Sequence, residues 1–129
     1  MQTYDVILSP SPTATHPPFV TMRAPAGLYE LTATRGGTDD YMAWTPRYKG
    51  TWQTGFSVMS DGFSDTSSTV LRAHSAQWPT PEQAVQNPAS LCFELDRWRI
   101  LTFFINDSYR DNSGGVTIRV NYDARAPSA

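Results

Sequence analysis

Acidic and amide side chains are concentrated in one short stretch near the C-terminus, "NDSYRDNS", residues 106–113. Asp107 follows an apolar run, and Asp111 and Asn112 come four and five residues after it. A tight hairpin connection needs only about two to five residues. Calcium takes about six to eight oxygen ligands from carboxylates, amides and backbone carbonyls, and it favours flexible loops. The stretch therefore has the chemistry of a calcium site. Turns use the same residue types, because Asp and Asn side chains accept hydrogen bonds from the local backbone, and that alternative stays open.

A calcium site would need a second loop, because Asp107, Asp111 and Asn112 supply only three side-chain ligands. The acidic pair Asp39-Asp40 lies in "TRGGTDDYMAW", directly after a predicted strand. If both loops lie at the same end of the fold, their carboxylates would repel one another without a cation. We therefore predict one calcium ion shared between the 106–113 loop and the loop that contains Asp40.

Three aromatic residues follow this acidic pair in a predicted loop: Trp44, Tyr48 and Trp52. Aromatic rings can stack on the apolar C–H faces of sugar rings, although Trp and Tyr also pack in the cores and edges of many β-sandwiches. We predict a ligand-binding surface formed by these three residues and Asp39.

The elements that must position these residues are short strands separated by turns. The cleanest alternation places Val116, Ile118 and Val120 on one face and Thr117 and Arg119 on the other, which indicates a sheet with one wet face. Strands are predicted within residues 4–8, 19–23, 27–37, 52–62, 68–74, 90–95, 99–106 and 115–122. About eight such strands favour a single antiparallel β-sandwich of jelly-roll type.

One short helix is predicted over residues 81–86. Thr80 is a suitable N-cap, Pro81 suits the first helical position, and Gln83 completes a capping box before Asn87-Pro88 ends the helix. Residues 1–129 are predicted to form one domain. The Pro-, Ser- and Ala-rich segments at about 9–18 and 123–129 are predicted to be extended arms.

Composition excludes several classes of function. The chain has 129 residues, of which 40% are hydrophobic and 17% charged, with ten Pro and eight Gly, and this favours a turn-rich β fold. A net charge of −2 gives no electrostatic basis for nucleic-acid binding, and no apolar run is long enough for membrane insertion. The N-terminus lacks the basic region of a signal peptide, so we expect a soluble protein made in the cytoplasm, with extracellular and virion-associated locations left open.

Catalysis and disulfide bonding are not expected. No nucleophile elbow, zinc-protease motif or phosphate-binding loop occurs, and His16, in a Pro-rich segment, and His74, at the end of a predicted strand, are expected to have structural or solvated roles. Cys92 is the only cysteine and is predicted to be a small core residue. Trp78 and Trp98 are predicted to be packing residues.

Two segments resemble the soluble galactophilic calcium-dependent bacterial lectins, a jelly-roll family of the galactose-binding-like superfold. "FFINDSYRDNSGGVTIRV", residues 103–120, is similar to their C-terminal hairpin, and "GLYELTATRGGTDDY", residues 27–41, is similar to a strand and loop that give calcium a backbone carbonyl. The resemblance implies that Asp107 is a bidentate calcium ligand. It also implies that Asp111 and Asn112 take the place of a pair of amide ligands, and that Tyr41 or Asp40 supplies the carbonyl.

The function expected from these observations is non-enzymatic, calcium-stabilised carbohydrate binding. The alternative is a structural virion component, such as a phage decoration or tail-associated jelly-roll protein whose arms contact neighbouring subunits. Both hypotheses predict an oligomer or a place in a larger assembly, with a glycan or neighbouring protein subunits as partners. The sequence identifies neither the sugar nor the assembly.

Overall fold

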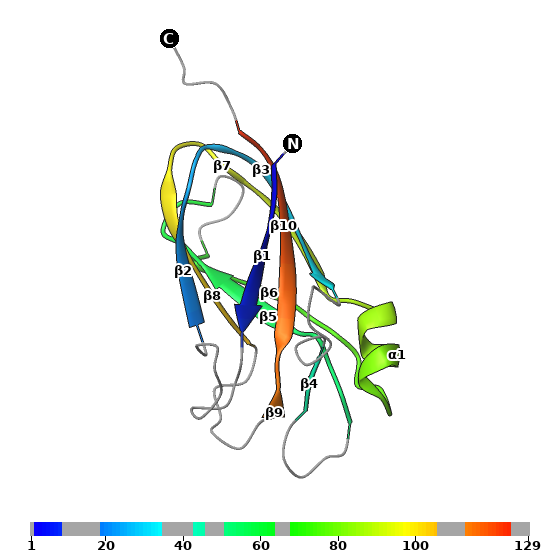
Figure 1. Cartoon of the computed structure of the whole chain (residues 1–129). Helices are drawn as coiled ribbons and strands as arrows, with labels where there is room; N and C mark the ends of the chain where they lie inside the picture. The colour runs from blue at the N-terminus through cyan, green and yellow to red at the C-terminus, as the bar shows by residue number, and fades with distance from the viewer. Residues whose placement is uncertain are drawn as a thin grey trace.

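The chain forms two antiparallel sheets that pack face to face, with one helix outside them (Figure 1). The computed structural model describes residues 2–8, 19–34, 43–45, 51–63, 68–105 and 113–124. The strands are β1 (Gln2–Leu8), β2 (Phe19–Ala24), β3 (Gly27–Thr34), β4 (Trp44–Thr45), β5 (Phe56–Met59), β6 (Val70–Ala73), β7 (Ser90–Leu95), β8 (Arg99–Ile105), β9 (Ser113–Gly114) and β10 (Val116–Ala124). The helix is α1 (Pro81–Gln86).

The strand order is that of a jelly roll. Sheet A has the order β1-β10-β3-β7, sheet B has the order β2-β8-β5-β6, and β4 and β9 form a small third sheet. In the two large sheets the first strand pairs with the last, the second with the second-last, the third with the third-last, and the middle two with each other. Such nested pairing arises when one long hairpin rolls up on itself. The predicted antiparallel β-sandwich with one short helix is confirmed.

The alternation predicted for the last strand determines how sheet A faces the core. Leu31 on β3 pairs with Val120 on β10, and Val6 on β1 pairs with Ile118. All four side chains are buried, whereas Arg119 between them on β10 is exposed. The strand period of two residues therefore places one row in the core and Arg119 on the outer face, but Thr117, predicted to lie on the wet face with Arg119, is only 1% exposed.

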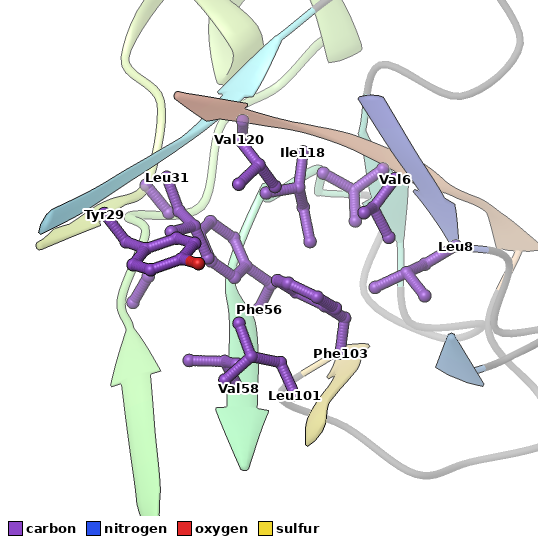
Figure 2. Packing of buried hydrophobic residues seen from close by; sticks show 14 of the residues in the cluster. Val6, Leu8, Tyr29, Leu31, Phe56, Val58, Leu101, Phe103, Ile118 and Val120 are labelled. Atoms are coloured by element: carbon purple, nitrogen blue, oxygen red, sulfur yellow. The ribbon is translucent and has the colours of Figure 1, made fainter. Parts of the chain in front are cut away.

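Sheet B supplies the other half of the core. Phe56 and Val58 on β5 and Leu101 and Phe103 on β8 are all fully buried. Figure 2 shows these side chains between the two sheets, opposite the residues of β1, β3 and β10. Burial of one such side chain stabilises the fold by about 1.5–3 kcal/mol. This apolar layer holds the two sheets together.

An aromatic cluster extends the core across the neighbouring strands β7, β3 and β10. The ring of Tyr29 stacks between Phe93 and Tyr122, with centroid distances of 5.2 and 5.1 Å, and its hydroxyl donates to the Pro25 carbonyl at 2.6 Å. Because Phe93 points into the core, the neighbouring Cys92 points out of the sheet and is exposed. The prediction that Cys92 is a core residue is wrong.

The helix α1 has the predicted boundaries and cap. The Thr80 hydroxyl accepts a hydrogen bond from the Gln83 amide at 3.2 Å, and the Asn87 amide donates to the Ala84 carbonyl at 3.2 Å as the helix ends. Ala84 is fully buried, so the helix packs on the domain through this small residue. Within the described residues, no helix is long and apolar enough to cross a membrane.

The C-terminal boundary differs from the prediction. β10 continues through Asp123 and Ala124, which pair with Leu28 and Gly27 on β3. The C-terminal arm therefore cannot begin at residue 123, because backbone pairing extends the strand beyond the end of the apolar alternation. The predicted N-terminal arm at 9–18 lies outside the described residues.

Candidate functional site

The small sheet formed by β4 and β9 lies at one end of the sandwich (Figure 1). Trp44 pairs with Gly114, and the Gly115 amide donates to the Ala43 carbonyl at 3.1 Å. These contacts join residues 43–45, which come after β3, to residues 113–115, which come directly before β10. They bring together two regions that lie about seventy positions apart in the printed sequence.

This pairing borders both oxygen-rich segments predicted from the sequence. Ala43 directly follows residues 35–42, and Ser113 directly follows residues 106–112. Trp44, which follows Ala43, lies on β4, and Ser113 lies on β9. Because β4 pairs with β9, the C-terminal ends of the two segments are held at the same small sheet. The described structure thus brings the residues that follow the two segments together, while the position of the segments themselves stays a prediction.

Glycine is required at position 114 by the closeness of this pairing. Gly114 has a φ of 84°, and a Cβ added there would lie 2.5 Å from the Ala43 carbonyl oxygen and 3.0 Å from Cζ3 of Trp52. L-residues with a side chain rarely adopt positive φ, and a backbone oxygen cannot move away independently of its chain. Gly114 is therefore part of the packing between β4 and β9.

Trp44 was predicted to lie in a solvent-accessible loop and to contact ligand, but it is a core residue. Its side chain is only 1% exposed, and its indole N–H donates to the Gly55 carbonyl at 2.9 Å. Its backbone also pairs with Gln53 through hydrogen bonds of 3.0 and 2.9 Å. Pairing with Gly114 on one side and Gln53 on the other turns the indole inward, so it offers no open face to a sugar.

Trp52 keeps part of its surface accessible. It is half-buried, and its backbone forms two hydrogen bonds with Trp78, of 2.7 and 2.8 Å. Both indoles pack against a small buried cluster of Ala43 and Ala84, which links the helix to β4. Trp78 is therefore a packing residue, as predicted, while ligand contact by Trp52 stays a prediction.

The remaining predicted site residues lie outside the described part of the chain, and their roles stay predictions. Among the described residues, no group of three or more His, Cys, Asp or Glu side chains is placed to hold a metal ion. The predicted residues outside the described ranges are Asp39, Asp40, Tyr41, Tyr48, Asp107, Asp111 and Asn112.

The outer face of sheet B carries an apolar surface that the sequence analysis missed. Phe19 on β2, Met59 on β5 and Ile100 on β8 are 59%, 43% and 49% exposed, and Trp98, just before β8, is 53% exposed. The prediction that Trp98 is a packing residue is wrong. In each of these strands every second side chain points into the core, so the apolar side chains between them face solvent.

A groove of about 470 Å³ crosses this outer face. Its apolar walls include Met59, Trp98 and Ile100. At its edge Arg99 Nε lies 3.6 Å from an Asp61 carboxylate oxygen. The guanidinium of Arg23 lies 4.3 Å from the centre of the Trp98 ring, a cation–π contact. The groove therefore combines exposed apolar surface with a paired arginine and carboxylate, and the guanidinium of Arg23 lies against Trp98 beside it.

The outer face of sheet A has the opposite character. Leu28 on β3 is 57% exposed and lies between its two pairing partners, Asp123 on β10 and Glu94 on β7. Glu30 lies two positions further along β3 and is also exposed. The result is an apolar side chain flanked by carboxylates.

Comparison of the chain with protein-family models, with curated proteins and with solved structures found no match.

Proposed function

We propose that this chain is a non-enzymatic carbohydrate-binding module stabilised by one calcium ion. The proposed ligands are Asp107, Asp111 and Asn112, together with Asp40 or the carbonyl of Tyr41. The observation that supports the proposal is the β4–β9 pairing, which holds the borders of the two ligand-bearing segments at one small sheet. The donor set of carboxylates, an amide and a carbonyl is the set that calcium prefers.

The buried surroundings of this small sheet support the same proposal. Thr45 donates through its hydroxyl to the Thr51 carbonyl at 2.5 Å, and Trp44 is anchored to Gly55. The frame next to the two segments is thus fixed by the core, and this lowers the entropic cost of assembling a site between them. A bound calcium ion would offset the repulsion among the carboxylates.

Thermal unfolding with calcium and with a chelator tests the metal part of the proposal. An ion that binds only the native state stabilises it by RT ln(1 + [L]/Kd), about 2.7 kcal/mol at a hundredfold excess over Kd. We expect a higher melting temperature in calcium, and we expect Asp107→Ala to remove the difference. Asp61→Ala is the matched control, because its side chain is 84% exposed on the edge of sheet B, and it should keep the full calcium response.

A glycan array tests the carbohydrate part. We expect the wild-type protein to bind a subset of glycans in calcium, and we expect the chelator and Asp107→Ala to reduce that binding. If no glycan binds while calcium still stabilises the protein, the calcium site stands and the lectin function fails. If the melts coincide and elemental analysis finds no metal, the 106–113 segment is only a turn and the whole proposal fails.

A structural role in a larger assembly, such as a virion, is the second candidate function. The outer face of sheet B favours it, because it carries four of the large exposed hydrophobic side chains of the described residues. Contiguous exposed apolar surface on a folded domain commonly marks an interaction site. A subunit of this kind would bind no glycan on the array and would associate with protein.

A further inference from the structure

The groove on the outer face of sheet B has walls of mixed chemistry. Three exposed apolar side chains line it, those of Met59, Trp98 and Ile100. Thr69 and Thr102 add two hydroxyl groups, and neither hydroxyl has a hydrogen-bond partner within the described residues. Met59 on β5 pairs with Thr102 on β8, so apolar and hydroxyl groups lie side by side in the groove.

The ring of Trp98 is held in place from one side. The guanidinium of Arg23 lies 4.3 Å from the ring centre, and Arg23 is not among the described residues that line the groove. Because the indole is 53% exposed, the part of the ring that Arg23 leaves uncovered borders the groove. A ring that is already fixed by a neighbouring contact loses little conformational entropy when a ligand packs on it.

The charges in the groove compensate each other. Arg99 Nε lies 3.6 Å from a carboxylate oxygen of Asp61, and these two are the charged residues in the described lining. A ligand with a net charge of either sign would therefore gain little attraction there. The groove favours an uncharged ligand.

The floor of the groove argues against a peptide strand and against an acyl chain. β8 lies between β2 and β5, and β5 lies between β8 and β6, so neither strand has a free edge to which a peptide could add. An acyl chain would cover the hydroxyls of Thr69 and Thr102 without giving them hydrogen bonds, which is costly. The walls fit a ring with an apolar face and hydroxyl groups around its edge.

We propose that this groove binds a neutral saccharide and needs no calcium ion to do so. An apolar C–H face of the sugar packs on Trp98 and Ile100, and the sugar hydroxyls exchange hydrogen bonds with the hydroxyls of Thr69 and Thr102. The site goes beyond the proposed function, because it shares no residue with the proposed calcium ligands and lies on a surface that the sequence analysis missed.

A glycan array probed in the presence of EDTA tests this site apart from the calcium site. We expect the wild-type protein to bind neutral glycans in EDTA. Trp98→Ala should lose that binding, and Thr102→Val, which keeps the shape of the side chain without its hydroxyl, should weaken it. Phe19→Ala is the matched control and should bind as wild type does, because Phe19 is an exposed aromatic residue on the same face of sheet B but outside the groove. Circular dichroism and a thermal melt check that each variant is folded.

Nuclear magnetic resonance shows which tryptophan meets the sugar. The chain has four tryptophans, and the indole N–H signal that is missing from Trp98→Phe identifies Trp98. Addition of a glycan retained on the array in EDTA should shift this signal more than the other three. A larger shift of another indole signal would overturn the proposal.

The array also separates this proposal from the calcium site. Glycan binding in calcium that disappears entirely in EDTA would overturn the groove site and leave the calcium-dependent function standing. Retention of charged glycans alone would contradict the neutral chemistry of the groove. A Trp98→Ala protein that binds as wild type does, or a wild-type protein that binds no glycan but associates with protein through this face, would overturn the proposal too.

Discussion

Substitution of Gly114 by alanine tests whether the β4–β9 pairing is as tight as the structure indicates. The new Cβ would lie 2.5 Å from the Ala43 carbonyl oxygen, and the residue would be held at a φ of 84°. Left-handed backbone costs a residue with a side chain about 1–2 kcal/mol. Relief of the clash would also weaken the 3.1 Å hydrogen bond from Gly115 to Ala43, worth about 0.5–1.5 kcal/mol.

The expected loss of unfolding free energy is therefore about 2–3 kcal/mol. For a domain of this size each kcal/mol changes the melting temperature by roughly 3–5 °C, so Gly114→Ala should melt about 6–15 °C lower than wild type. Urea unfolding at fixed temperature and differential scanning calorimetry measure the loss independently. Because β4 and β9 border both predicted ligand segments, the calcium-dependent rise in melting temperature should shrink as well.

Gly62→Ala is the matched control for this substitution. The three atoms nearest to a Cβ at position 62 would all belong to the guanidinium group of Arg99, with Nε at 1.9 Å, and a side chain can move away where a backbone carbonyl cannot. We expect a smaller loss of stability for Gly62→Ala than for Gly114→Ala. Equal losses, or a Gly114→Ala protein as stable as wild type, would refute the tight pairing of the small sheet.

Three further substitutions test the core and the helix. Thr54→Val removes the buried hydroxyl that accepts a 2.9 Å hydrogen bond from the Ala89 amide, and it should cost about 1–3 kcal/mol in urea unfolding; an unchanged midpoint would contradict that bond. Phe103→Ala should cost about 3–5 kcal/mol of unfolding free energy, because the ring is fully buried between the sheets. Phe104→Ala, on the outer face of β8, should cost clearly less. The reverse order would mean that β8 faces the other way. Thr80→Ala should cost about 0.5–2 kcal/mol by calorimetry and Thr80→Ser almost nothing, and equal losses would argue against the cap.

Local sequence signals were sufficient to predict much of the fold. The alternation that put Leu31 and Val120 on core faces follows from the period of the strand and needs no knowledge of the partner strand. The cap at Thr80 is likewise local, because its acceptor and the Gln83 amide lie within one turn of helix. The sandwich class followed from the number and spacing of such strands, while the nested strand order required the structure.

Local sequence signals could not predict which aromatic residues are exposed and which are buried. Trp44 is buried because its backbone pairs with Gly114 and Gln53, and nothing near Trp44 in the sequence encodes the distant partner. Trp98 lies between β7 and β8, outside both strands, and is exposed together with Asp96 and Arg97. Where both rows of a strand are apolar, alternation does not tell which row faces the core.

Calcium titration calorimetry on the purified, chelator-stripped protein tests the central claim most directly. The account predicts saturable binding of one calcium ion per chain, with no binding heat in Asp107→Asn and an unchanged titration in Asp61→Asn. Asp61 is the appropriate comparison, because its carboxylate is exposed and pairs with Arg99 on the edge of sheet B. Absence of binding heat in the wild-type protein, together with no metal in elemental analysis, would contradict the claim, and so would an Asp107→Asn protein that binds calcium as wild type does.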